Sequence, residues 1–347
     1  MNRSRLIGIV TTLTLSLAVL LAACGGGPAA SDGAQQDIAI QASFQTVNDQ
    51  RLSSFSLDLA QLPPASEGQA YAVWWIGNDG KLTLAGTAVG GQTFEYTDPA
   101  GENLVGKVAG ARVSVEEASA VSSGGLASAS ENWFGGGIPQ AILADVRLLV
   151  VSAPDTPANT PYDPGLKAQT ILAHNHAELA QEAVNAGDLA SAKNHAEHII
   201  NILSGSADAE FGDHNGDGET QNPGDGYGVW PYAFKVTEIA DRIAEVPNLG
   251  AEQRDAALVM GLCARHISTT GPQAIQQAKL LIAAENAEAA KQVAQALADF
   301  LDVLANGTDA NGNGTIEAVA DECGSQQIYQ LAHRLFDFQL TKGSPAK

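Results

Sequence analysis

Four prolines crowd into the middle of the chain, and they exclude one continuous helix or strand across it. Residues 153–164 contain four of the 14 prolines of the sequence. Proline lacks the backbone N–H and clashes with the preceding helical turn, so this density is incompatible with a helix interior or a central strand. The sequence therefore predicts a linker over residues 153–165, with a folded region on each side.

The region before the linker, residues 38–152, has patterns typical of strands. Residues 55–59 alternate apolar and polar side chains, and residues 71–76 are aromatic and β-branched, with a turn signal at Asn78-Asp79-Gly80. Residues 113–115 and 146–151 complete the set of expected strands. Short strands separated by turn residues predict an antiparallel β-sandwich. The Ser-, Gly- and Ala-rich stretch 119–137 predicts a long loop.

The region after the linker, residues 166–342, has the period of helices. Apolar residues recur on one helical stripe from Leu189 to Leu203, and Asp188 stands where an N-cap belongs. Further helices are expected over residues 251–269, 273–306 and 326–341. The pattern predicts an antiparallel helical bundle and, with the sandwich, an α+β protein of two domains.

The N-terminus has the three zones of a secretory signal. Two arginines precede an uncharged apolar run, which ends in Leu21-Ala22-Ala23-Cys24 and a Gly-rich stretch. The tetrapeptide resembles the lipobox of bacterial lipoproteins. That resemblance implies a signal peptide over 1–23, a diacylglycerol on Cys24, a flexible tether over 24–37 and a location on the extracytoplasmic face of a bacterial membrane. The alternative is a transmembrane anchor, since about 18 apolar residues just span a bilayer.

The charge of the chain limits its partners. Residues 1–23 carry two basic and no acidic residues, so their removal would lower the net charge from −21 to −23. A surface this negative repels nucleic acid and anionic lipid headgroups, and both are excluded as main partners. The same charge favours cations.

Several motifs of the first region resemble those of the extracytoplasmic C-terminal domain of anti-sigma-K factors. They are Leu62-Pro63-Pro64, Tyr71-Ala72-Val73-Trp74, Gly80, Leu84-Ala85-Gly86-Thr87 and Val113-Ser114-Val115-Glu116. The resemblance implies a sandwich fold and a sensing or binding role for residues 40–152. The sequence departs from that family at its start, where five residues precede the apolar run, so a cytoplasmic domain that grips a sigma factor is not expected. Tyr71, Trp74 and Trp75 are either core aromatics or a ligand platform.

Two acidic loops in the second region resemble EF-hand and dockerin calcium loops. Loop 1 (residues 213–225) and loop 2 (residues 309–321) place oxygen side chains at positions 1, 3 and 5 and glycine at position 6. Calcium takes 6–8 oxygen ligands, and this spacing brings them around one ion. The expected loop 1 ligands are Asp213, Asn215, Asp217, Glu219, Gln221 and Asp225. Those of loop 2 are Asp309, Asn311, Asn313, Thr315, Glu317 and Asp321.

Both loops depart from the calcium pattern at position 12. The bidentate carboxylate that belongs there is replaced by Gly224 in loop 1 and by Ala320 in loop 2. Asp225 and Asp321 follow one position later and Glu322 one further, so the last ligand is expected to be displaced, replaced by water or absent. The alternative is that both loops are turns that bind nothing.

All seven histidines lie between His174 and His333. At about 100° per residue, His174 and His176 point about 200° apart and cannot share a ligand site. His195 and His198 are about 60° apart and are a candidate pair of transition-metal ligands. With His176 they suggest a transition-metal or haem carrier, although a Cys-x-x-Cys-His haem attachment motif is absent. Core or interface positions are the alternative.

After Cys24 the chain has two cysteines, Cys263 and Cys323. They either form a disulfide or are small buried apolar residues. Motifs of serine hydrolases, zinc proteases, P-loops and dinucleotide-binding folds are absent, so an enzyme is not expected. The leading hypothesis is a surface-anchored binding or structural lipoprotein with an unknown extracytoplasmic partner or ligand and a calcium-ordered helical domain. The alternatives are the histidine-based carrier and an enzyme without a recognisable motif.

Overall fold

The computed structural model describes residues 38–47, 51–122 and 133–343. The expected signal peptide, Cys24 and the whole of the expected tether lie outside the described residues. Within the described part of the chain, no helix has both the length and the apolar character needed to cross a bilayer.

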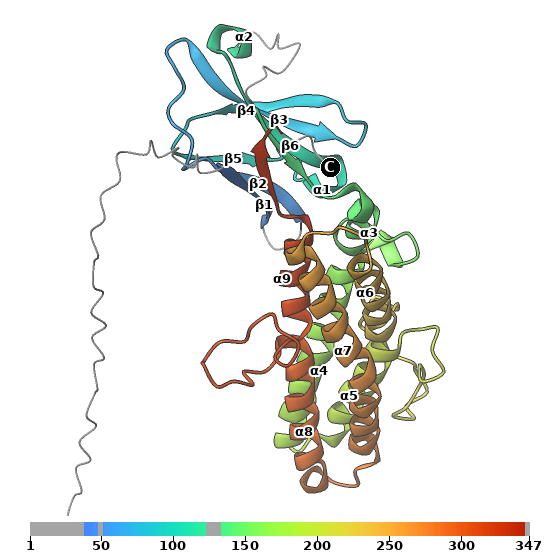
Figure 1. Ribbon diagram of the computed structural model, residues 1–347. Helices are drawn as coiled ribbons and strands as arrows, with labels where there is room; N and C mark the ends of the chain where they lie inside the picture. The colour runs from blue at the N-terminus through green and yellow to red at the C-terminus, as the bar shows by residue number, and fades with distance from the viewer. Residues whose placement is uncertain (1–37, 48–50, 123–132, 344–347) are drawn as a thin grey trace, which may run out of the picture. The chain divides into compact units, whose positions relative to one another are not determined.

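The described strands form one antiparallel sheet of eight strands, in the order β4-β3-β6-β7-β8-β1-β2-β5 (Figure 1). They are β1 (Ala39–Val47), β2 (Arg51–Asp58), β3 (Gln69–Gly77), β4 (Leu82–Ala88), β5 (Thr93–Thr97), β6 (Val108–Glu117), β7 (Trp133–Gly137) and β8 (Phe338–Lys342). The two edge strands approach each other, because the ring of Phe94 lies 3.2 Å from where a Cβ on Gly86 would lie. The sheet therefore curls towards a barrel, and its strands are linked in one continuous hydrogen-bonded order.

The strand β8 comes from the far end of the chain. It pairs with β1, where Ile40 faces Leu340, and with β7, where Gly135 faces Thr341. At Gly136 the backbones come so close that a Cβ would lie 2.2 Å from the carbonyl oxygen of Gln339. A glycine is required there, so the Gly-rich sequence of β7 reflects close strand packing.

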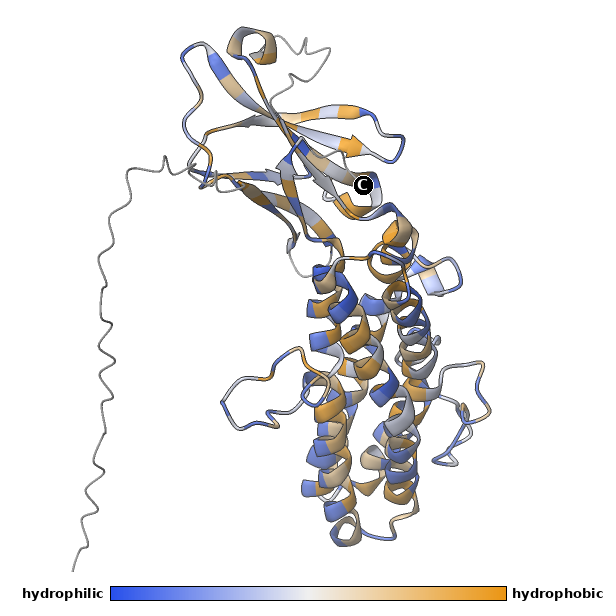
Figure 2. Cartoon of the chain, in the orientation of Figure 1, coloured by the Kyte–Doolittle hydropathy of each residue, from blue (hydrophilic) through white to orange (hydrophobic). Residues whose placement is uncertain are grey.

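The longer helices lie between β7 and β8 in sequence, and the described residues also include three short helical elements. These three are α1 (Leu104–Lys107), α2 (Ala118–Ser122) and the 3-10 turn η1 (Pro157–Asn159). The longer helices are α3 (Gln140–Val150), α4 (Tyr162–Asn185), α5 (Leu189–Ser204), α6 (Val229–Ala244), α7 (Ala251–Ala283), α8 (Ala287–Asn306) and α9 (Ser325–Phe336). Their apolar faces turn inward and their polar faces outward (Figure 2). The α+β class is confirmed.

Several expected boundaries were wrong. Residues 146–150 belong to helix α3, with Val151 as its C-cap, because Ile142, Val146, Leu149 and Val150 form a buried helical stripe that the apolar, β-branched composition concealed. The last helix ends at Phe336, after which Phe338 and Leu340 alternate inward as a strand. The break expected near Pro272 is absent, since α7 continues to Ala283. The helix expected over 273–306 is instead interrupted at residues 284–286, because Asn286 caps the start of α8.

The linker is also shorter than the expected residues 153–165. Helix α4 begins at Tyr162, with Pro161 as its N-cap residue and Pro164 in its first turn. Proline is tolerated in a first turn, because the backbone N–H groups there have no partner within the helix. Residues 133–137 of the expected long loop are strand β7, whereas residues 123–132 lie outside the described part of the chain.

One large hydrophobic core runs through the sheet and the helices, and Ala72, Trp74 and Val121 form a small separate cluster. Phe44 of β1 packs against Phe336 of α9 with ring centroids 5.8 Å apart, and Asp337 accepts a hydrogen bond from the Phe44 N–H at 3.0 Å. Tyr71, Trp74 and Trp75 are 5%, 7% and 8% exposed, so they are core aromatics. The two regions expected as separate domains thus share one core.

Candidate cation sites

Loop 1 connects α5 to α6 and is folded around the side chain of its first residue. The Asp213 carboxylate accepts the N–H groups of Gly216 (2.7 Å) and Gly218 (2.9 Å), at positions 4 and 6. Both glycines have positive φ angles, 79° and 91°, a conformation that side-chain-bearing residues rarely adopt. Asn215 Oδ1 accepts the Asp217 N–H at 2.8 Å, and Asp217 Oδ1 accepts the Glu219 N–H at 2.8 Å.

Loop 2 connects α8 to α9 and repeats the same arrangement position by position. Asp309 accepts the N–H groups of Gly312 (2.7 Å) and Gly314 (2.8 Å). Asn311 Oδ1 accepts the Asn313 N–H at 3.0 Å, and Asn313 Oδ1 accepts the Thr315 N–H at 2.8 Å. The two loops, which share Asp, Asn and two Gly residues at positions 1, 3, 4 and 6, thus have one backbone fold.

A buried glutamate from outside each loop holds two of its positions together. Glu197 of α5, which is fully buried, accepts the N–H groups of Asn215 (3.1 Å) and Gln221 (2.9 Å), at positions 3 and 9. Glu322, which is 2% exposed, accepts the N–H groups of Asn311 (3.3 Å) and Glu317 (2.8 Å), again at positions 3 and 9. The sequence placed Glu322 two positions after position 12 of loop 2, whereas it gave no sign of Glu197.

The residues expected to supply the last calcium ligand lie elsewhere. The Asp225 carboxylate accepts the N–H of Tyr227 (2.9 Å) and the hydroxyl of Tyr232 (2.8 Å), so its hydrogen bonds serve the start of α6. Asp321 is exposed, whereas its neighbour Glu322 is buried against loop 2. In both loops the additional carboxylate that accepts hydrogen bonds from the loop backbone therefore belongs to a buried glutamate. It does not belong to the aspartate at position 13.

Position 9 differs between the loops. Glu317 stays with its loop, because its carboxylate accepts the side-chain amides of Asn311 (3.0 Å) and Asn313 (3.3 Å). Gln221 turns away from loop 1, and its Oε1 lies 2.9 Å from Nε2 of His198. The Gln221 side chain was expected to face a loop cation, and the structure places it against a histidine instead.

Cys263 of α7 and Cys323 form a disulfide, with their Cα atoms 5.8 Å apart. Cys323 directly follows Glu322. The bridge therefore ties the buried glutamate of loop 2 to the longest helix.

Three histidines converge between α4 and α5, and we call them the three-histidine cluster. Nδ1 of His176 lies 3.0 Å from Nδ1 of His195 and 3.4 Å from Nδ1 of His198. One nitrogen from each ring lies within 4.8 Å of the other two. The pair expected from its helical spacing, His195 and His198, is thus joined by His176 from the neighbouring helix.

The cluster is half-buried, and this favours the neutral form of its rings. Burial lowers the pKa of His176 to about 4, with a smaller contribution from the charges of His198 and His195. Burial also lowers the pKa of His195, helped by the charge of His198. Neutral imidazole is the form that ligates a metal ion.

The other histidines of the second region lie apart from the cluster. His174 Nε2 lies 3.7 Å from carboxylate oxygens of Glu178 and Asp302, on a different face of α4 from His176. His214 Nε2 contacts the carbonyl oxygen of Glu210 at 2.7 Å, and His266 is exposed on α7.

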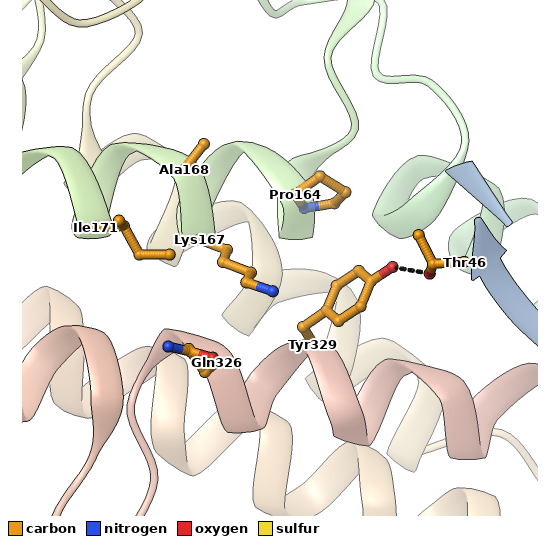
Figure 3. Close-up of a pocket in the computed structure, with 7 residues that line it drawn as sticks. All are labelled: Thr46, Pro164, Lys167, Ala168, Ile171, Gln326 and Tyr329. Atoms are coloured by element: carbon orange, nitrogen blue, oxygen red, sulfur yellow. Dashed lines mark hydrogen bonds between the residues drawn. The ribbon is translucent and has the colours of Figure 1, made fainter. Parts of the chain in front are cut away.

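A separate pocket of about 550 Å³ lies where α4, α9 and β1 meet (Figure 3). The Lys167 ammonium lies 4.7 Å from the centroid of the Tyr329 ring, and the Tyr329 hydroxyl is 2.6 Å from Thr46 Oγ1. Neither the loop residues nor the three-histidine cluster line this pocket.

The chain has no match among protein-family models, curated proteins or solved structures. Its function is therefore argued from its own residues.

Proposed function

We propose that this chain is a lipid-anchored extracytoplasmic binding or structural module, not an enzyme, whose helical region is ordered by calcium. The observation that carries the proposal is the shared backbone fold of loops 1 and 2. In both loops the aspartate at position 1 gathers the N–H groups of positions 4 and 6, and a buried glutamate gathers those of positions 3 and 9. A repeated frame of this kind favours a shared purpose over two chance turns.

The donor atoms suit a hard cation. Oxygen side chains at positions 1, 3 and 5 surround the turn, and calcium prefers 6–8 oxygens at about 2.3–2.6 Å. Gly216 and Gly312 have φ angles of 79° and 72°, which glycine adopts without strain, so the turn can be tight. Position 12 carries no carboxylate in either loop, and the buried glutamate is a carboxylate close to the loop. We therefore expect modest calcium affinity, with a Kd of about 10⁻⁴–10⁻³ M, as is typical of extracellular calcium modules.

Calcium would act at helix junctions. The two ends of the segment that contains loop 1 are joined by a hydrogen bond from the Ser206 N–H to the Gly226 carbonyl at 2.8 Å. Those of loop 2 are joined by a hydrogen bond from the Thr308 N–H to the Glu322 carbonyl at 2.8 Å. Without a cation the carboxylates within each loop repel one another. A bound ion would neutralise them and fix how α5 joins α6 and how α8 joins α9.

The curled sheet is the part we assign to a protein or ligand partner outside the cytoplasm. The resemblance of its motifs to the extracytoplasmic domain of anti-sigma-K factors supports this assignment by analogy alone. The burial of Tyr71, Trp74 and Trp75 means that recognition would use other residues of the sheet. A lipid on Cys24 would hold this module at the membrane.

The calcium proposal is tested by melting the purified full chain in detergent, in EDTA and in millimolar Ca²⁺. At a concentration 100 times Kd, each site stabilises the fold by about 2.7 kcal/mol. At about 2–4 °C per kcal/mol this is a shift of several degrees. Asp213→Ala and Asp309→Ala should each remove part of the calcium-dependent shift, because position 1 is a direct ligand.

The matched control is Asp208→Ala. Asp208 is an exposed aspartate before loop 1 whose carboxylate accepts the Glu210 N–H at 2.8 Å, so its loss removes a similar charge and turn contact. Its calcium-dependent shift should equal that of the parent chain. Identical melting curves of the parent in EDTA and in calcium would reduce both loops to structural turns.

A further inference from the structure

We propose that His176, His195 and His198 form a binding site for one divalent transition-metal ion of the zinc class, coordinated through the three Nδ1 atoms. The ligand chemistry is nitrogen, unlike the oxygen sites of the loops. The proposal goes beyond calcium binding and does not rest on it.

The distances between the nitrogens match those around a metal ion. Two nitrogens bound to tetrahedral zinc at about 2.0–2.1 Å lie about 3.3–3.4 Å apart. Nδ1 of His176 is 3.0 Å from that of His195 and 3.4 Å from that of His198. Since all three ligand atoms lie within 4.8 Å of one another, small ring rotations would centre them on one ion.

Gln221 fixes the tautomer of one ring in the form that binds metal. An amide oxygen only accepts hydrogen bonds, so Nε2 of His198, at 2.9 Å from Gln221 Oε1, carries the ring proton. Nδ1 of the same ring then has a lone pair, and it faces the cluster. Metal-ligating histidines commonly donate their other ring N–H to such an oxygen, which orients the ring.

Hydrogen bonds within the three-histidine cluster do not satisfy all of its nitrogens. If His176 Nδ1 carries a proton, it can donate a good hydrogen bond to Nδ1 of either His195 or His198. The Nδ1 atom of the other ring then has no good hydrogen bond within the cluster. Without that proton, the lone pairs of His176 and His198 face each other at 3.4 Å. A metal ion accepts all three lone pairs at once, and this removes the conflict.

The backbone supports the site from two helices and a loop. His176 lies on α4, and His195 and His198 are three residues apart on one face of α5. Glu197, between the two α5 ligands, holds the N–H of Gln221 at 2.9 Å and so positions the residue that orients His198. The oxygen loop and the nitrogen site therefore share the segment from Glu197 to Gln221.

Three convergent nitrogens favour a bare ion over haem. Haem iron takes axial ligands on opposite faces of its ring, so at most two histidines coordinate it and they lie far apart. Three protein ligands leave a fourth position of a tetrahedral ion for water or a small ligand. Because the cluster is half-buried, that position can be reached from solvent.

The test titrates the full chain, stripped with chelator and purified in detergent, with Co²⁺ and then Zn²⁺ at saturating Ca²⁺. Calcium keeps the oxygen loops occupied, so the nitrogen site is read alone. We expect one equivalent of Co²⁺ with the strong visible absorption of a four-coordinate site, displaced by one equivalent of Zn²⁺. His176→Gln, His195→Gln and His198→Gln should each weaken binding at least about tenfold.

Two further histidines and two Gln221 variants separate ligation from a structural role. His174→Gln, on the same helix as His176, and the exposed His266→Gln should bind Zn²⁺ as the parent does. Gln221→Ala should lose about 10–100-fold in affinity, and Gln221→Glu should restore it, because a carboxylate accepts the His198 Nε2–H at least as well.

The proposal is overturned if the parent chain takes up no Co²⁺ at one equivalent. It is equally overturned if His174→Gln weakens binding as much as His176→Gln, or if Gln221→Ala and Gln221→Glu behave alike. A calcium-insensitive chain that still binds Zn²⁺ would refute the proposed function and leave this site standing.

Discussion

The environment of Asp163 disfavours an ionised carboxylate. This residue is fully buried in the first turn of α4, and within the described part of the chain neither of its carboxylate oxygens has a hydrogen-bond partner. Burial raises its pKa from 3.8 to about 8, against the opposing charge of Lys167. A carboxyl in this setting is held as the neutral acid near neutral pH.

Asp163→Asn should therefore change how stability depends on pH. The folded-state pKa, about 8, lies above the unfolded value of 3.8, so the folded chain binds the extra proton between them. The contribution to stability is complete below about pH 4 and is lost as pH rises towards 8. The variant lacks this titration and should exceed the parent by on the order of a few kcal/mol at pH 8.5, with a smaller difference at pH 5.

Urea unfolding of both proteins at pH 5 and pH 8.5 measures this difference. Glu252→Gln is the control, because Glu252 is an exposed acid in the first turn of α7 and its loss should leave the pH dependence as it is. Parallel pH profiles of parent and Asp163→Asn would mean that Asp163 titrates normally.

Glu322 gives the second prediction at this scale. Glu322→Gln keeps the size of the side chain but replaces the buried carboxyl group next to loop 2 with an amide. The calcium affinity of loop 2 should therefore fall at least about tenfold, as it does when other supporting groups around a metal are removed. Asp321→Asn, one residue earlier and exposed, should change it little. Calcium titration of the two variants decides the matter, and a larger loss from Asp321→Asn would return the last-ligand role to the position that the sequence suggested.

The sequence indicated both loops and placed Glu322 next to loop 2, but it gave no sign that Glu197 lies at loop 1. The roles of Asp213 and Asp309 follow from local spacing, because residues at fixed intervals in a short turn lie at fixed positions relative to one another. Glu197 lies sixteen residues before Asp213, and its place at loop 1 depends on how α5 returns past that loop. His176 was grouped with His195 and His198 as a candidate carrier site, but helical angles describe one helix at a time and could not predict that the three rings meet.

At the scale of elements, the disulfide joins α7 to the closing end of loop 2. Cys263 is fully buried, and the bridge closes a loop of 60 residues. In the chain-entropy account a closure of this length stabilises the fold by about 4 kcal/mol, although many bridges deliver less. Replacing both cysteines by alanine should therefore lower the free energy of unfolding by about 2–4 kcal/mol.

The double variant should also weaken loop 2 more than loop 1. Cys323 holds the residue beside Glu322 in place, whereas loop 1 lies far from the bridge along the chain. Combining the double variant with Asp213→Ala, and separately with Asp309→Ala, isolates each loop in calcium titrations. An equal loss in both loops would show that the bridge acts through general stability alone.

Helix boundaries were missed where packing overrode local signals. Pro272 lies inside α7, and the hydroxyls of Ser268 and Thr269 bond back to the Arg265 carbonyl at 2.9 Å. Gly271 packs against Trp230 so closely that a Cβ would lie 1.7 Å from its Nε1. The Gly-Pro pair, which predicts a break, instead marks the close approach of α6 to α7.

At the scale of the whole molecule, β8 makes the sheet depend on the end of the chain. Composition and periodicity were enough for the α+β class, because alternation and 3.6-residue stripes are local properties. The return of residues 338–342 into the sheet is not local. It pairs β8 between β1 and β7 across about 300 residues of sequence, and no short pattern carries that information.

Leu340→Ala tests whether the sheet and the helices unfold together. Leu340 is fully buried at the centre of the sheet, so its truncation should lower the free energy of unfolding by about 2–5 kcal/mol. Leu82→Ala removes the same atoms from the edge strand β4, where Leu82 is 39% exposed, and should cost about 0.5 kcal/mol or less. Because one core spans both regions, hydrogen exchange should rise in β1 and β7 and, to a similar degree, in α4 and α9. Faster exchange confined to the strands would instead show that the helices hold their structure independently, and that the shared core is a contact between two separately folding parts.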